Sequence, residues 1–248
     1  MKQVSQWVWS LGLLFCLSLG VCLGLNALEN PDLPPLKSHP LPPSLQGLAV
    51  SEGDNYFESL QPSPLGYLIW SQFPITVYVD QSPHPQDPSA ANQRFLQWTA
   101  TVKTAIADWN RYLPLQIIAD PDKADIQIRY QDPPLTPPKN PQTGQISLPR
   151  ARNAQTRYQF YTTEGTPPTL RHRMTIQIKP GLGRESTLAT ARHEFGHALG
   201  IWGHSPNPQD VLYVSATKET PPISSRDVNT LVKIYQQPTR LGWPLPKH

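Results

Sequence analysis

Hydrophobic and polar positions predict one strand and one long helix at the start of the folded part of the chain. Residues 73–80 alternate between apolar and polar side chains and include several β-branched residues, a pattern typical of a strand. From Arg94 to Leu113, large apolar residues recur every three or four positions. That spacing places them on one face of a helix, which we expect to pack on a core.

The rest of the pattern predicts four more strands and two more helices. The strands are expected at 115–119, 124–130, 157–163 and 172–179. The helices are expected at 187–199, with Ser186 as N-cap, and at about 226–235, where Ser224 and Asp227 resemble a capping box. The predicted order is therefore strand, helix, four strands, helix, helix.

Residues 1–28 have the pattern of an export signal. Lys2 precedes an uncharged, apolar run from Trp7 to Leu25, which is the order found in secretory signal peptides. The run is also long enough to span a bilayer, so an uncleaved membrane tether through residues 7–25 remains an alternative to a cleaved signal peptide. Both alternatives imply an exported domain that is secreted, periplasmic or membrane-anchored.

Proline content suggests how the rest of the chain is divided. The chain has 30 prolines among 248 residues, well above the usual share of roughly 5 %. Many lie in residues 29–66, which we expect to be an extended linker because proline has a fixed φ and no backbone donor. The folded domain is then expected at 67–236, followed by a C-terminal tail at 237–248.

Charge and cysteine content exclude several classes of protein. The formal net charge is +3 and charged residues make up 16 % of the chain, which does not indicate a nucleic-acid-binding protein. The two cysteines, Cys16 and Cys22, both lie in the apolar run. A disulfide framework or a thiolate metal site is therefore excluded after residue 22.

One short motif carries the candidate chemistry. His193 and His197 are four residues apart on a predicted helix, so both imidazoles face the same side and can bind one metal ion. Glu194 follows the first histidine, where its carboxylate can take a proton from a water activated by that metal. Gly200 ends the helix at a position where the chain can turn back and bring a third histidine to the metal.

With these residues the sequence resembles the metzincin zinc metallopeptidases, especially the matrixin-like branch, whose signature is H-E-x-x-H-x-x-G-x-x-H followed by a methionine turn. The resemblance covers residues 67–236, where 124–128 look like the third strand and 225–231 like the start of the last helix. It implies an α+β fold with a mixed, twisted five-stranded sheet and three helices. It also implies a zinc endopeptidase with His193 and His197 as ligands of one Zn²⁺ and Glu194 as general base.

The third ligand departs from the spacing of that family. The signature would place it at Gly203, which has no side chain, so we assign it to His204, one residue later. Gly203 can absorb the extra residue because glycine tolerates unusual backbone angles. Asp210 is the alternative third ligand, since carboxylates also bind zinc.

The methionine turn and the cysteine latch of the family are also altered. Leu212 stands where the methionine is expected and can form a hydrophobic floor of similar volume. Tyr213 is expected to line the substrate pocket, to point at the metal, or to be an ordinary core or rim residue. Once the signal is removed no cysteine remains, so the propeptide thiolate that keeps members of that family latent has no counterpart here. We interpret His172 as a strand residue, since a structural zinc site needs four ligands and His172 has no neighbouring cluster.

The resemblance implies a protein or peptide substrate, bound in extended form along residues 157–163 as an exposed sheet edge. We expect a monomer without a nucleic-acid partner. Calcium is compatible with the family, but no acidic loop in the sequence supports it. The competing hypothesis is an exported zinc-binding module without catalysis that acts in adhesion or assembly, against which the presence of Glu194 argues.

Overall fold

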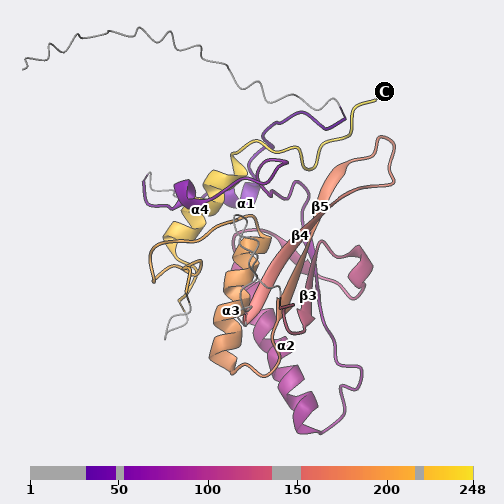
Figure 1. Cartoon of the computed structure of the whole chain (residues 1–248), viewed down its shortest axis with the longest axis vertical. Coiled ribbons are helices and arrows are strands. Elements are labelled where there is room, and N and C mark those ends of the chain that lie inside the picture. Colours follow the sequence, from indigo (N-terminus) through magenta and orange to yellow (C-terminus); the bar gives the residue numbers. More distant parts are fainter. Residues whose placement is uncertain (1–31, 49–52, 136–151, 216–220, 248) are drawn as a thin grey trace, which may run out of the picture. The chain divides into compact units, whose positions relative to one another are not determined.

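A five-stranded mixed sheet with helices packed on it forms the part of the chain that the computed structural model describes (Figure 1). The described residues are 32–48, 53–135, 152–215 and 221–247, and they belong to one unit spanning Pro31–His248. The architecture is α+β, as predicted, with four α-helices in the described ranges rather than three. The additional helix is a single turn, α1 (Pro43–Gln46).

The sheet has one antiparallel pair at its edge. Across it lie, in order, β2 (Leu115–Ile117), β1 (Ile75–Val79), β3 (Ile126–Tyr130), β5 (Leu170–Ile178) and β4 (Ala154–Thr162). Neighbouring strands are parallel except that β4 runs antiparallel to β5. All five predicted strands are present, with ends shifted by a few residues. The prediction that the strand near residues 157–163 lies at a sheet edge is confirmed.

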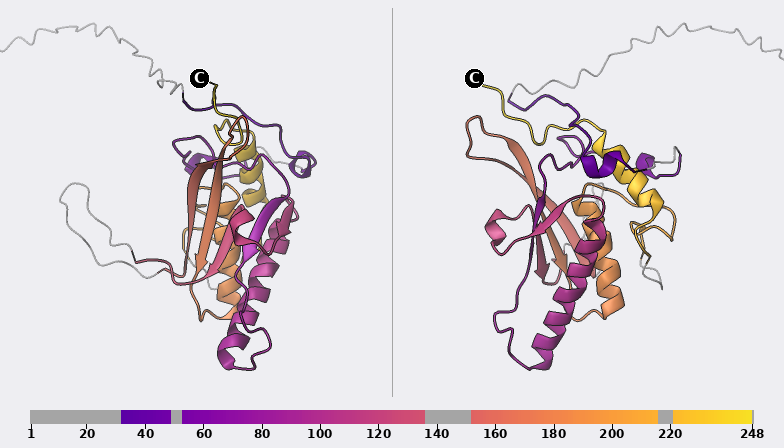
Figure 2. Two further views of the ribbon diagram at one scale, coloured as in Figure 1. Left: turned by 90° about the vertical axis from the view of Figure 1, so that its right-hand side faces the viewer. Right: turned by 180° about the vertical axis from the view of Figure 1, so that it is seen from behind.

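Two helices, α2 (Ala90–Trp109) and α3 (Arg184–Ala198), pack together on the sheet (Figures 1 and 2). Side chains of β5 alternate between buried and partly exposed along the whole strand, as a strand covered on one face requires. Trp109 of α2 is fully buried, and its indole Nε1 donates to the carbonyl oxygen of Arg192 in α3 at 2.9 Å. This packing holds α3, which carries the histidine motif, in place.

The predicted helix ends agree with the structure at α4 (Ser225–Tyr235) and differ at the other two helices. The capping box of α4 is confirmed, since Ser224 and Asp227 exchange both of its hydrogen bonds. Helix α2 ends at Trp109, earlier than predicted, and the chain then turns into β2. Helix α3 begins at Arg184 with Gly183 at the N-cap. The assignment of Ser186 as N-cap was wrong, because the amide of Thr187 already bonds to Gly183 and places Ser186 within the first turn.

The prediction of an extended linker over residues 29–66 was wrong for its described residues. Leu45 and Tyr56 are buried in the hydrophobic core, and Leu60 and Leu65 contribute to it as well. Proline removes backbone donors, but apolar residues between the prolines still gain free energy by burial, and here they find a core within reach. The folded domain therefore begins well before residue 67.

The predicted C-terminal tail also belongs to the domain. Thr239 and Leu241 are buried, and the backbone of Thr239 pairs with that of Lys37 through hydrogen bonds of 2.9 and 3.2 Å. The two ends of the described chain therefore pack against each other, and the boundary that we placed at residue 236 does not exist.

No helix within the described ranges is long and apolar enough to cross a membrane. The apolar run 7–25, on which the predicted signal or tether depends, lies outside the described residues.

Candidate metal centre

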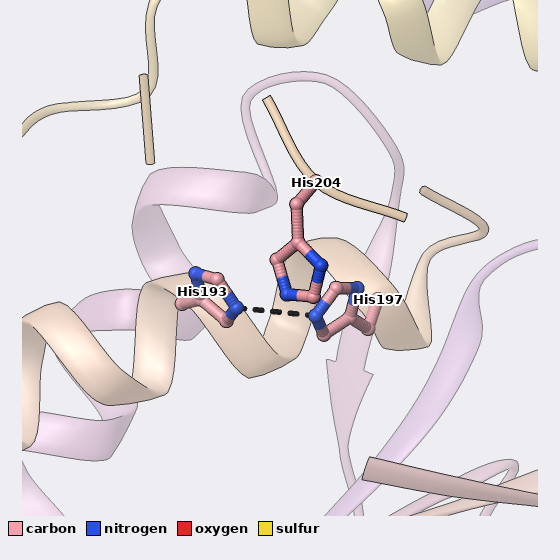
Figure 3. Close-up of side chains that lie close together, drawn as sticks. All are labelled: His193, His197 and His204. Carbon is pink, nitrogen blue, oxygen red and sulfur yellow. Dashed lines mark hydrogen bonds between the residues drawn. The ribbon is translucent and has the colours of Figure 1, made fainter. Parts of the chain in front are cut away.

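Three histidines converge at the C-terminal end of α3. His193 and His197 project from the helix, and His204 comes from the loop that follows it (Figure 3). One ring nitrogen from each histidine lies within 4.8 Å of the others. Three imidazoles at this separation can act as ligands of a single metal ion, so the structure brings together the three residues that the sequence singled out.

Backbone carbonyls orient two of the three rings. His193 Nδ1 lies 2.9 Å from the Val211 oxygen, and His197 Nδ1 lies 2.8 Å from the Ile201 oxygen. These contacts place the hydrogen of each neutral ring on Nδ1 and leave a lone pair on Nε2. The two Nε2 atoms face each other at 3.1 Å. Histidines that bind a metal through one ring nitrogen commonly donate the hydrogen of the other nitrogen to a carbonyl in this way, and three imidazole donors suit zinc.

Burial keeps these imidazoles neutral. It lowers the pKa of both His193 and His197 to about 4 and also lowers the pKa of His204. Neutral imidazole is the form that binds a metal, so little proton release is needed when an ion enters at neutral pH.

The turn after α3 depends on Gly200. Its φ is 117°, in the region that favours glycine, and a Cβ at this position would lie only 2.7 Å from the Leu68 oxygen. The amide of Ile201 donates to the Gly196 oxygen at 3.0 Å, which closes the helix end. The chain thereby reverses and brings His204 back over the helix, as the sequence predicted.

Glu194 lies beside the histidines and is buried, with 8 % of its surface exposed. Burial raises the pKa of its carboxyl above the ordinary range. Thr156 of β4 donates its hydroxyl to Glu194 Oε2 at 2.5 Å. Thr156 was not predicted from the sequence, because a threonine in a strand has no motif that marks it as part of a site.

Leu212 and Tyr213 lie beneath and beside the histidines. Leu212 is fully buried and packs directly on Gly196, between the two histidines of α3. Tyr213 is half-buried and lines a cavity of about 260 Å³ that His193 and Glu194 also line. Leu212 therefore occupies the place of a hydrophobic floor, and Tyr213 forms part of a pocket wall.

Asp210, the alternative third ligand, is engaged elsewhere. It is buried and accepts hydrogen bonds from Ser205, from Ser224 Oγ at 2.7 Å and from Arg226 Nε at 3.1 Å. Both of its oxygens are used in these contacts, and among the described residues the ligand group consists of the three histidines. The structure thus favours His204 over Asp210.

His172 lies away from this group, as we expected of a strand residue. It is buried in β5 and stacks on Trp70 with ring centroids 3.9 Å apart. Burial lowers its pKa to about 3.

A cleft of about 830 Å³ opens above the three histidines and Glu194. One wall is the start of β4, from Ala154 to Thr156, at the free edge of the sheet. Another part is formed by Ser59 and Gln61 of the N-terminal segment. This contribution was not predicted, because the proline content of the segment indicated a linker.

No protein-family model and no curated protein matches this chain. The function must therefore be inferred from the residues and geometry of the site itself.

Proposed function

We propose that the protein is an exported zinc-dependent endopeptidase of the metzincin type, with His193, His197 and His204 as zinc ligands and Glu194 as general base. The observation that carries the proposal is the convergence of three neutral imidazoles and one buried carboxylate at the floor of a cleft beside a free strand edge. Three protein ligands with an open fourth position are typical of catalytic zinc sites, whereas structural sites use four ligands.

The residues of the site have distinct roles in this proposal. A zinc ion held by the histidines would polarise the peptide carbonyl and lower the pKa of the attacking water. Glu194 is adjacent to His193 in the chain and lines the same cleft, so its carboxylate is placed to take the proton of that water and deliver it to the leaving amine. Thr156 occupies Oε2 of this carboxylate and fixes its orientation.

The substrate is proposed to be a peptide segment in extended form. In the sheet of the described residues β4 is an edge strand, to which such a segment can add as a further strand. A segment added there passes over the histidines, because residues 154–156 line the same cleft. The smaller cavity beside Tyr213 is placed to receive a side chain next to the scissile bond.

The proposal is tested by measuring bound zinc and the cleavage of casein or gelatin with the purified protein. We expect one zinc ion per chain and cleavage that a chelator abolishes. Glu194→Gln should retain zinc, because the ligands are unchanged, and should lower kcat by about 10²- to 10⁴-fold, the usual contribution of a general base.

Glu185 provides the matched control, since it is an exposed glutamate on the same helix. Glu185→Gln should cleave like the parent. Stoichiometric zinc without any cleavage, or cleavage that Glu194→Gln does not reduce, would instead support the non-catalytic zinc-binding module.

Export is part of the same proposal and rests on the uncharged run from Trp7 to Leu25. Fractionation of producing cells should find the domain outside the cytoplasm. N-terminal sequencing of the exported protein then distinguishes the alternatives, because a cleaved signal removes the run and a tether retains it.

A further inference from the structure

Residues 54–65, which we name the strap, cross the loop that carries the third histidine. We infer that the strap positions His204 for metal binding and is therefore part of the metal centre. The inference rests on the proposed zinc site and adds to it a set of positioning residues.

The middle of the strap touches the residues directly before His204. Leu60 and Gly203 form an antiparallel β-bridge, and the amide of Gln61 donates to the Trp202 oxygen at 3.3 Å. A Cβ at Gly203 would lie 2.7 Å from Leu60 Cδ2 and 2.9 Å from the Ser59 oxygen. The two main chains are therefore in contact, with no room for a side chain between them.

The N-terminal end of the strap is anchored on α4. Asp54 forms an ion pair with Arg226 at 3.2 Å, and its carbonyl oxygen accepts from Asn229 Nδ2 at 2.8 Å. The hydroxyl of Tyr56 donates to Asp227 Oδ1 at 2.6 Å inside the protein. Because Asp227 also accepts from the amide of Val211, the same carboxylate supports the segment whose carbonyl orients His193.

The C-terminal end of the strap is anchored on the last residues of the described chain. The Leu65 oxygen accepts from the amide of Arg240 at 2.8 Å and from Thr239 Oγ1 at 3.3 Å. With both ends held, the middle of the strap is a fixed surface against which residues 202 and 203 rest.

His204 needs such support more than the other two ligands. The rings of His193 and His197 are each oriented by a backbone carbonyl. Among the described residues no hydrogen bond reaches the ring of His204, which is also the most exposed of the three. Its position is therefore set by the main chain on either side of it. After His204, the amide of Ser205 donates to the Leu212 oxygen at 2.8 Å, and before it the strap contacts residues 202 and 203.

The test compares two substitutions at the exposed residue Gln61 in the full chain. Gln61→Pro removes the amide that donates to Trp202, whereas Gln61→Ala keeps it. Loss of a group that orients a metal ligand costs about 10- to 100-fold in metal affinity. We expect Gln61→Pro to weaken Zn²⁺ binding by that factor, measured by competition with a chromophoric chelator, and Gln61→Ala to bind like the parent.

A second pair of variants tests the contact at Gly203. Gly203→Ala introduces a Cβ where the strap leaves no room and should also weaken zinc binding about 10- to 100-fold. Gly47→Ala is the control, because a Cβ there meets nothing within 4 Å. The midpoint of thermal unfolding of the metal-free proteins shows whether each variant is folded.

A double-mutant cycle separates positioning of His204 from a general effect on the fold. In the background of His204→Ala, Gln61→Pro should cause no further loss of zinc affinity, since the ligand through which the strap acts is gone. Equal losses in both backgrounds, or parent-like zinc binding by both Gln61→Pro and Gly203→Ala, would overturn the inference. Failure of the unaltered protein to bind zinc at all would instead overturn the proposed function.

Discussion

At the scale of single residues, Thr156 is the side chain whose role most depends on the fold. It lies opposite Ile176 in the β4–β5 pair, and its hydroxyl contacts both Oε2 and the backbone oxygen of Glu194. The motif around His193 singles out Glu194, but only the register of the edge strand brings a donor to its carboxylate. In the proposed mechanism Thr156 is therefore a positioning residue that acts through Glu194.

Replacement of Thr156 by the isosteric valine should lower catalysis without removing zinc. A hydrogen bond to a charged group contributes about 1.5–3 kcal/mol, so kcat should fall about 10- to 100-fold. The zinc content should stay at the parent level, because no ligand changes. Thr156→Ser, which restores the hydroxyl, should recover most of the rate, and a serine variant as slow as the valine variant would contradict the assigned role.

At the scale of elements, the packing of α3 on the turn at Leu212 decides the geometry of the site. Gly196 lies between the two histidines of the helix, and the side chain of Leu212 fills the space that a Cβ would need. Glycine in the middle of a helix costs about 1 kcal/mol relative to alanine. Here the absence of a side chain at Gly196 allows α3 to lie in close contact with Leu212.

Gly196→Ala should therefore destabilise the protein, although alanine is the better helix former. Overpacking in a core costs about 1–3 kcal/mol, and the better helix propensity of alanine offsets about 1 kcal/mol of that cost. We therefore expect the free energy of unfolding to fall by up to about 2 kcal/mol, measured by denaturant titration of the metal-free protein. The double variant Gly196→Ala/Leu212→Val has a smaller side chain opposite the new Cβ and should recover part of the lost stability. Gly47→Ala, which meets no neighbour, should leave the stability nearly unchanged. A stabilised Gly196→Ala variant would show that α3 and Leu212 are not in close contact.

At the scale of the whole domain, the N-terminal and C-terminal segments of the described chain pack together and share the core with the sheet and helices. Residues 32–48 and 53–66 pack with residues 237–247 and with α4, so the core includes residues from both ends of the described chain. The C-terminal segment also contacts the start of β5. The amide of Leu170 donates to the Trp243 oxygen at 3.1 Å, and the nearby His172 is stacked on Trp70. Unfolding of this unit exposes His172 to water.

This burial predicts a loss of stability in acid. The pKa of His172 is about 3 in the folded protein against 6.5 in the exposed state. Below pH 6.5 the unfolded chain binds a proton that the folded chain does not, so the free energy of unfolding falls as the pH falls, by up to about 1.4 kcal/mol per pH unit, until the pH nears 3. His172→Phe, which can still stack on Trp70, should show a smaller dependence between pH 6 and 4 in thermal unfolding of the metal-free protein. An unchanged slope would contradict the assignment.

The sequence by itself determined the elements and the candidate metal-binding residues of this protein. Apolar spacing predicted the five strands and the main helices, and the four-residue interval between His193 and His197 predicted their convergence, because helix geometry is local. Gly200 and the position of His204 predicted the return of the chain for a similar reason. These features depend on residues only a few positions apart, so they can be predicted from the order of residues along the chain.

The tertiary structure decided what depends on distant contacts. It placed Thr156 against Glu194 across 38 positions of sequence, engaged Asp210 with α4, and folded the proline-rich segment onto the domain. A high proline content shows that a segment lacks the backbone donors for a regular helix or a central strand. Whether its apolar residues are buried depends on a surface formed by other parts of the chain. For that reason the sequence indicated a linker where the structure has a strap against the third histidine.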